Sequence, residues 1–129
     1  MAVPKFRVWH KPMQRMGEVL AISFERQKVK IRHLRGTTHM TVQFDDVELM
    51  QSTGLLDKNG EEILEGDVVE WEHKDTKQLV KGVVKYDMEF GFWGMTDVRF
   101  KELKAIGYLS EQNVTVLGNK FENPELMEV

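Results

Sequence analysis

Short stretches of alternating apolar and polar residues, separated by turn-forming residues, set the strongest limit on how this chain folds. Near the start, Phe6 and Val8 alternate with Arg7 and Trp9. An apolar residue at every second position is typical of a strand with one buried face. Similar stretches recur along the chain, with Gly, Asp and Asn between them. The pattern therefore predicts a mainly β protein with minor helical content.

The alternating pattern over residues 1–49 predicts an N-terminal lobe made of a β-hairpin or meander. Three further strands are expected on apolar residues at every second position: Met16, Leu20, Ile22 and Phe24; Val29, Ile31 and His33; and Met40, Val42 and Phe44. A helix over residues 16–34 is the alternative, because Leu20, Phe24 and Ile31 also recur at helical spacing. The β-branched residues and the polar break between the first two stretches favour the hairpin.

Residues 50–67, with the sequence MQSTGLLDKNGEEILEGD, are rich in turn formers. Asp57 to Gly60 and Glu65 to Asp67 predict two tight reversals, since Asp and Asn bond to their own backbone and Gly adopts positive φ. We expect this segment to connect two lobes. Its residues are expected to matter for the backbone conformation that they allow, and not for a binding or catalytic role. On this interpretation the Asp57 side chain contributes only modestly to stability.

Residues 68–129 predict a small C-terminal β-barrel whose order of elements resembles an SH3-like barrel. That comparison concerns architecture alone. Five strands are expected, at Val68 to Glu72, Leu79 to Tyr86, Glu89 to Trp93, Thr96 to Phe100 and Val114 to Leu117, with a short helical turn over Lys101 to Tyr108.

Composition narrows the class of protein. Apolar residues make up 41% of the 129 residues, which is enough for a core, and no apolar run reaches the ~20 residues that span a bilayer. The start of the chain lacks the apolar region of a signal peptide. Cysteine is absent, which fits a reducing compartment and excludes disulfides and thiolate chemistry. We therefore expect a cytoplasmic protein without a membrane partner.

Catalytic and metal-binding patterns are missing from the sequence. It contains no GxSxG elbow, and no glycine-rich run of the kind that cradles phosphates. The carboxylates Asp45 and Asp46 are adjacent, so on a strand they point to opposite faces. His33 and His39 flank a predicted turn, but four scattered histidines without a metal are the simpler interpretation. We expect no enzyme activity, no catalytic residue, no metal and no cofactor.

Two groups of residues are the candidate binding surfaces. One is aromatic and belongs to the predicted barrel; its members are Trp71, Tyr86, Phe92 and Trp93. Most of these rings are expected to fill the core, and those left exposed suit a protein partner or stacked bases. The other group is basic: Lys28, Lys30 and Arg32 share one face of a predicted strand. A solvated charged face is the simpler interpretation of the basic group, because the face opposite a buried one is ordinarily charged.

Several motifs together resemble a known family. They are Phe6-Arg7-Val8-Trp9, Met50 to Leu55, Asp57 to Gly60, Glu65 to Val69 and Leu117 to Leu126. In this order they are similar to the YopX family, found mainly in bacteriophages and prophages. The resemblance covers the whole chain and implies phage or prophage origin, the host bacterial cytoplasm and a mostly β fold. His10 and Ser52 depart from the usual residues, so neither receives a family role.

The resemblance implies no established biochemical activity. Our hypothesis is a non-enzymatic accessory or protein-interaction module that binds itself, as a homo-oligomer, or a host or phage protein. The alternative is a nucleic-acid-binding module that uses the basic face around Lys28 to Arg35 and exposed aromatic residues of the barrel. The net charge of −3 favours the first.

Overall fold

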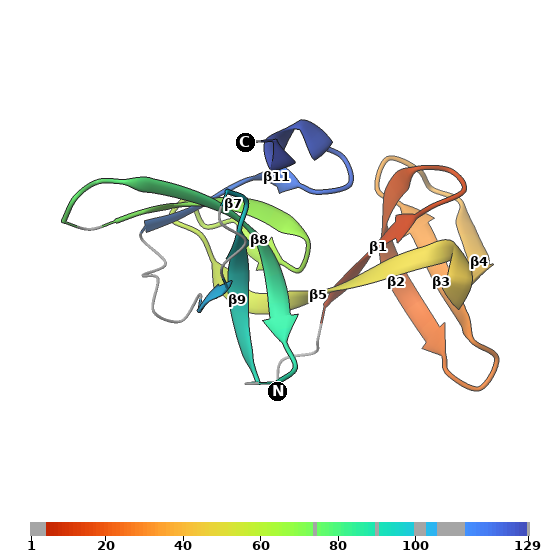
Figure 1. Cartoon of the computed structure of the whole chain (residues 1–129). Coiled ribbons are helices and arrows are strands. Elements are labelled where there is room, and N and C mark those ends of the chain that lie inside the picture. Colours follow the sequence, from red (N-terminus) through yellow and green to blue (C-terminus); the bar gives the residue numbers. More distant parts are fainter. Residues whose placement is uncertain (1–4, 74, 90, 100–102, 106–112, 129) are drawn as a thin grey trace. The chain divides into compact units, whose positions relative to one another are not determined.

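The computed structural model describes residues 5–73, 75–89, 91–99, 103–105 and 113–128. The chain divides into two compact units, Met1–Ser52 and Thr53–Val129, called unit 1 and unit 2 here. Its elements (Figure 1) are β1 Phe6–His10, β2 Arg15–Ser23, β3 Lys28–His33, β4 His39–Gln43, the 3-10 turn η1 Phe44–Asp46, β5 Val47–Leu56, β6 Glu62–Leu64, β7 Asp67–Glu72, β8 Leu79–Asp87, β9 Phe92–Asp97, β10 Leu103–Ala105, β11 Val114–Asn119 and the 3-10 turn η4 Pro124–Met127. The predicted mainly β class is confirmed.

Unit 1 is an antiparallel meander. Its strands are hydrogen-bonded in the order β4-β3-β2-β1-β5, so each of the first four strands pairs with its neighbour in the chain, and β5 then returns alongside β1. Residues 16–34 form the β2–β3 hairpin and not a helix. Its turn uses Gln27 at a φ of 53°, and the Arg26 amide donates to the Ser23 hydroxyl.

The core face of unit 1 differs from the prediction on β2. A β-bulge lies between Val19 and Ala21, so the register shifts by one residue there. Val19 and Ile22 pack on the core, whereas Leu20 and Phe24 are exposed. The expectation that Met16, Leu20, Ile22 and Phe24 share one face is therefore wrong. The buried residues at the centre of this core are Val8, Val29, Ile31 and Val47.

The turn-rich segment contains more regular structure than its composition indicated. It includes the second half of β5 and the whole of β6. Both predicted reversals are present, and Gly60 and Gly66 occupy them with φ values of 80° and 86°. Side chains with a Cβ rarely adopt this region, which explains glycine at both positions.

Unit 2 contains a five-stranded antiparallel sheet in the order β10-β9-β8-β7-β11. The strands predicted at Glu89 to Trp93 and Thr96 to Phe100 correspond to one strand, β9, since Met88 and Glu89 lie in a turn before it; Phe90 and Phe100 lie outside the described residues. The predicted helical turn over Lys101 to Tyr108 is wrong at Leu103–Ala105, which pair with β9 as β10; the remainder of that range lies outside the described residues. Closure of the sheet into an SH3-like barrel stays a prediction.

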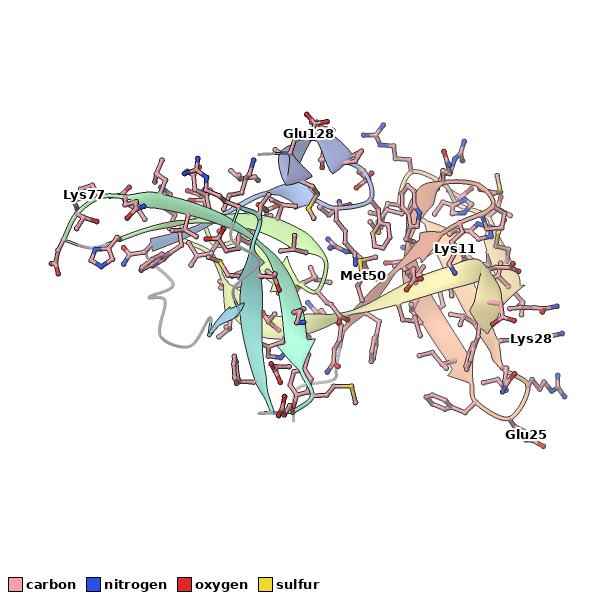
Figure 2. The ribbon with its side chains drawn as sticks, viewed as in Figure 1. Lys11, Glu25, Lys28, Met50, Lys77 and Glu128 are labelled. Carbon is pink, nitrogen blue, oxygen red and sulfur yellow. The ribbon has the colours of Figure 1, made fainter. Side chains whose placement is uncertain are left out.

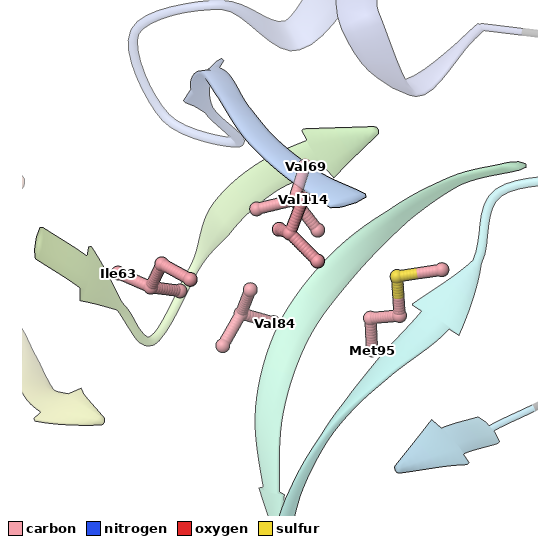
Figure 3. Close-up of a cluster of buried hydrophobic side chains, with 5 residues drawn as sticks. All are labelled: Ile63, Val69, Val84, Met95 and Val114. Atoms are coloured by element: carbon pink, nitrogen blue, oxygen red, sulfur yellow. The ribbon is translucent and has the colours of Figure 1, made fainter. Parts of the chain in front are cut away.

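The core of unit 2 draws on five strands. Its fully buried side chains come from β6, β7, β8, β9 and β11, and Figure 3 shows them gathered between the ribbons: Ile63, Val69, Val84, Met95 and Val114. Leu55, from the end of β5, packs against this cluster. The turn segment therefore supplies part of the core as well as the connection to it.

Asp57 joins the first reversal to the last strand of the sheet. Its carboxylate is buried and accepts the amides of Asn59 and Glu61 at 2.8 Å, and the amide of Val116 on β11 at 2.9 Å. The Lys58 amide also donates to the Val114 carbonyl at 2.9 Å. The reversal thus satisfies backbone groups on β11, which the sheet pairs on one side with β7 alone.

We predict that Asp57→Ala lowers the free energy of unfolding by more than about 2 kcal/mol, because three backbone donors lose their acceptor and each costs about 1–3 kcal/mol when unmet. This is larger than the modest effect expected from the sequence. Asn59→Ala is the matched control in the same turn, since its exposed side chain makes no hydrogen bond within the described part of the chain. Urea unfolding of both variants measures the difference. Equal losses in the two would contradict this role for Asp57.

Candidate functional site

Three of the four predicted aromatic residues come together at one end of the β8–β9 hairpin. Tyr86 lies opposite Trp93, and Asp87 lies opposite Phe92. The Tyr86 and Trp93 rings meet edge to face, with 5.1 Å between their centroids. Trp93 also packs on the unit 2 core, whereas Tyr86 is 44% exposed. We call Tyr86, Met88, Phe92 and Trp93 the hairpin tip.

Local backbone chemistry shapes this hairpin tip. The Asp87 carboxylate accepts the Glu89 amide at 2.9 Å, and the Asp87 carbonyl accepts the Gly91 amide at 2.8 Å. Gly91 takes a φ of 71°, which allows the chain to enter β9. Met88 lies within this turn and is 89% exposed. Met88 was not predicted as a surface residue, although its position between Asp87 and Glu89, three residues before Gly91, indicated an exposed turn.

Trp71 belongs elsewhere in unit 2. It pairs with Val80 and Val114 near the other end of β8, and its ring packs on the unit 2 core. A second contact is edge to face with His73, at 5.4 Å between centroids. Trp71 is therefore a core residue in large part and is separate from the hairpin tip.

The predicted basic face is present on β3 in unit 1. Lys28 and Lys30 are exposed and Arg32 is half-buried, while Val29, Ile31 and His33 point into the core. Figure 2 shows the Lys28 side chain extending away from the ribbon. Arg32 is ion-paired with Glu18 on β2. Lys28 and Lys30 make no ion pair within the described part of the chain.

A ring that the alternating pattern placed in the core is exposed in unit 1. Phe24 follows β2 directly and is 78% exposed. It contacts Phe44 edge to face, with 6.2 Å between centroids. Phe24 lies in the turn after Ser23, where β2 has ended, so the alternation of the strand does not extend to it. The predicted aromatic residues are all in unit 2, so Phe24 is the exposed ring that unit 1 supplies.

Two histidines form a buried pair in unit 1. His10 Nδ1 and His33 Nε2 are 3.1 Å apart, and the rings stack with 5.3 Å between centroids. One imidazole must donate and the other accept, which requires at least one neutral ring. Burial lowers the pKa of His33, and the nearby charges of His10 and Arg15 lower it further. His39 lies on the opposite face, across from Arg32, so it does not join this pair.

Within the ranges that the structure describes, no group of three or more His, Cys, Asp or Glu side chains is placed to hold a metal ion. In those same ranges, no helix is long and apolar enough to cross a membrane.

The buried carboxylate of Asp57 accepts hydrogen bonds from backbone amides. Burial alone would raise its pKa, but these donors and Lys58 outweigh burial and hold the pKa below its ordinary value of 3.8.

This chain is similar to one protein family and to solved structures. The model of the family described as YopX protein matches residues 5–128. The chain belongs to the YopX family. Protein EF1440 from Enterococcus faecalis, known from a crystal structure, is 29% identical to it; the match covers 99% of this chain and 100% of that one, with a TM-score of 0.63.

A second solved structure supports the fold. The X-ray structure of protein yopX from Bacillus subtilis is 19% identical, covers 97% of this chain and 96% of its own, and has a TM-score of 0.64. At this identity the likeness concerns the fold alone. No curated protein matches the chain. The resemblance inferred from the motifs is thus confirmed, and its full length agrees with the matched range.

We predict that the free energy of unfolding falls as the pH drops below about 6.5, the ordinary pKa of histidine. The lowered pKa of His33 means that the unfolded chain takes up a proton before the folded one, so acid favours unfolding across the interval between the two pKa values. His33→Gln keeps a hydrogen-bonding group beside His10 without titrating. Urea unfolding between pH 7.5 and 5 should show a shallower decline in this variant. If stability falls with pH equally in the original protein and in His33→Gln, His33 is not the cause of the decline.

Proposed function

We propose that this YopX-family protein is a non-enzymatic accessory module of a phage or prophage that works by contacting another protein in the cytoplasm of the host bacterium. The observation that carries the proposal is the hairpin tip, where Tyr86 and Met88 remain exposed beside Trp93 and Phe92. Its phage origin and location rest on the family resemblance.

The chemistry of the hairpin tip suits a protein partner. Tyr, Trp and Met are enriched at the centres of protein interfaces, where a few such residues supply most of the binding free energy. The edge-to-face contact between Tyr86 and Trp93 limits the motion of the exposed ring. An ordered ring loses less conformational entropy on binding than a free one. The flexible Met88 side chain adapts to the surface it meets.

Three buried polar residues of unit 2 satisfy backbone donors. The buried Asp57 caps backbone amides, and the buried Asp67 carboxylate accepts the Leu64 amide at 2.8 Å. Asn119 accepts the Phe121 and Glu122 amides before η4. Because these polar groups are engaged in hydrogen bonds that stabilise turns and strand ends, we propose that the protein acts by surface contact and not by catalysis. The partner is a second copy of the chain or a host or phage protein.

We expect Tyr86→Ala combined with Met88→Ser to weaken partner binding at least about tenfold, because truncating one hot-spot residue typically costs more than ~1.4 kcal/mol. The variant should melt close to the original protein, since both side chains project into solvent. Leu79→Ser is the matched control: it is 56% exposed at the other end of the same strand.

Two measurements read this out. Sedimentation velocity follows self-association, and affinity capture from a host that carries the gene, quantified by mass spectrometry, follows other partners. A species lost in the double variant and retained in Leu79→Ser supports the proposal. A protein that is monomeric at all concentrations and captures the same proteins in all three forms would rule it out.

A further inference from the structure

We propose that the open edge of β4 in unit 1 takes up an extended acidic peptide of a partner protein as an additional strand. The backbone of the peptide would pair with His39, Thr41 and Gln43, and its carboxylates would face Lys28 and Lys30. This inference goes beyond the protein contact proposed above, because it concerns unit 1 and uses none of the hairpin-tip residues.

The outer side of β4 has no strand partner among the residues that the structure describes. β4 pairs with β3 alone and ends the hydrogen-bonded order of its sheet. The Phe44 amide donates to the Gln27 carbonyl at 3.0 Å, and these two residues continue the β3–β4 register by one pair. Hydrogen-bonded pairs occur at every second position of an antiparallel ladder, so Val42 and Met40 are the β4 residues that bond to β3.

His39, Thr41 and Gln43 consequently direct their backbone N–H and C=O groups toward the open side. Within the described ranges, no hydrogen bond to another element uses these groups. An exposed edge of this kind can pair with a further strand, and the main-chain hydrogen bonds then supply the affinity. The sequence of β4 is HMTVQ, without the Lys, Pro or bulge that blocks such pairing at other edges.

The sheet of unit 2 provides a contrast. β11 also pairs with one strand, β7, but the turn at Asp57 occupies its other side. The Val116 amide donates to the Asp57 carboxylate, and the Val114 carbonyl accepts the Lys58 amide. The fold therefore satisfies the edge of β11 from within the chain. The described residues contain no comparable cap on β4, so its edge keeps the capacity to pair with a partner.

Charge is divided unevenly between the two units. Residues 1–52 contain nine Lys and Arg against five Asp and Glu, a net charge of +4. Residues 53–129 contain nine against sixteen, a net charge of −7. The acidic total of the chain therefore conceals a basic unit. A basic unit attracts an acidic partner and speeds their encounter.

The solvent face beside the open edge is where this charge meets β4. Lys28 lies opposite Gln43 and Lys30 lies opposite Thr41, in the pairs whose side chains approach most closely. An added strand would lie about 10 Å from β3, which is two strand spacings. A Glu side chain and a Lys side chain together span that distance across the small Thr41. Carboxylates on the outward face of the peptide therefore match the two lysines.

The opposite face beside the edge is apolar. Met40 and Val42 are half-buried and pack against the core of unit 1, and Phe44 packs there as well. A strand laid along β4 would cover the remaining exposed parts of Met40 and Val42. Successive side chains of a strand point to opposite faces. The peptide that fits both faces therefore alternates acidic and apolar residues.

This combination separates an acidic peptide from other occupants of the edge. A second copy of β4 brings no carboxylate, because its outward side chains are His39, Thr41 and Gln43, and it places a second cationic face beside the first. An oligonucleotide offers phosphates to the lysines but no row of backbone amides to the carbonyl groups of the edge. An acidic polypeptide engages the edge and the lysines at once.

The test uses a short fluorescein-labelled peptide in which Glu and Val alternate, titrated with the full chain and followed by anisotropy. Thr41→Pro removes an N–H that points away from β3, and proline is tolerated at such an edge position. This variant should bind the peptide at least about tenfold more weakly. Thr41→Ala is the matched control, because it keeps the N–H and should bind like the original protein. Thermal melts verify that both variants are folded.

A modified peptide tests the edge without changing the protein. N-methylation of every second residue keeps the charge of the peptide and removes the amide donors that face β4. This peptide should bind at least about tenfold more weakly than the unmodified one. In hydrogen exchange followed by NMR, the unmodified peptide should slow the amides of Thr41 and Gln43. The amides of Met40 and Val42, which already bond to β3, should be slow with and without it.

The charge requirement is tested separately. Lys28→Ala with Lys30→Ala should weaken binding about threefold or more at about 0.05 M salt and have little effect at about 0.5 M, where ions screen exposed charges. Lys85→Ala removes an exposed lysine of unit 2 and should bind like the original protein. A peptide with Lys in place of every Glu should bind at least about tenfold more weakly.

Four results would overturn the inference. They are an absence of saturable binding at low salt, equal affinity in Thr41→Pro and Thr41→Ala, equal affinity for the Glu and Lys peptides, and self-association of the protein that Thr41→Pro abolishes while no peptide binds. The last result would assign the edge to a second copy. Tyr86→Ala with Met88→Ser should bind the peptide normally, so failure of the hairpin-tip proposal and failure of this inference are distinguishable.

Discussion

The Asp57 carboxylate is the interaction on which the arrangement of unit 2 most depends. One oxygen accepts two amides of its own turn, and the other accepts the amide of Val116, 59 residues further along the chain. The same turn donates the Lys58 amide to the Val114 carbonyl. A local reversal and a distant strand are thereby held in one register. Because Ile63 and Val114 belong to the same buried cluster, this register also aligns the core.

The candidate binding surfaces lie outside this framework, where the fold leaves side chains exposed. The β8–β9 hairpin extends beyond its core pair, Val84 and Met95, and so carries Tyr86 and Met88 into solvent. In unit 1 the alternation of β3 sends Val29 and Ile31 inward and the lysines outward. Each surface therefore follows from a strand whose opposite side is buried, and the two surfaces differ in chemistry. One is aromatic in an acidic unit, and the other is cationic in a basic unit.

Periodicity predicted most strands because burial of one face imposes a period of two on the side chains. β1, β3, β7 and β8 lie within about a residue of where the alternation placed them. The errors have local causes. The bulge at Leu20 changed which residues of β2 face the core, and a turn at Met88 and Glu89 left one strand, β9, where two were predicted. β5 and β6 were hidden in a segment whose glycines and polar residues indicated turns alone.

The sequence by itself determined the β class, the family, the two reversals and the basic face of β3, because each depends on residues that are neighbours along the chain. Tertiary structure alone decided that Asp57 caps a distant strand, that His10 and His33 meet in the core of unit 1, and that Phe24 contacts Phe44. It also separated Trp71 from Tyr86 and Trp93. These outcomes depend on register and on contacts between strands remote in sequence, and a one-residue shift in register changes the face to which a side chain points.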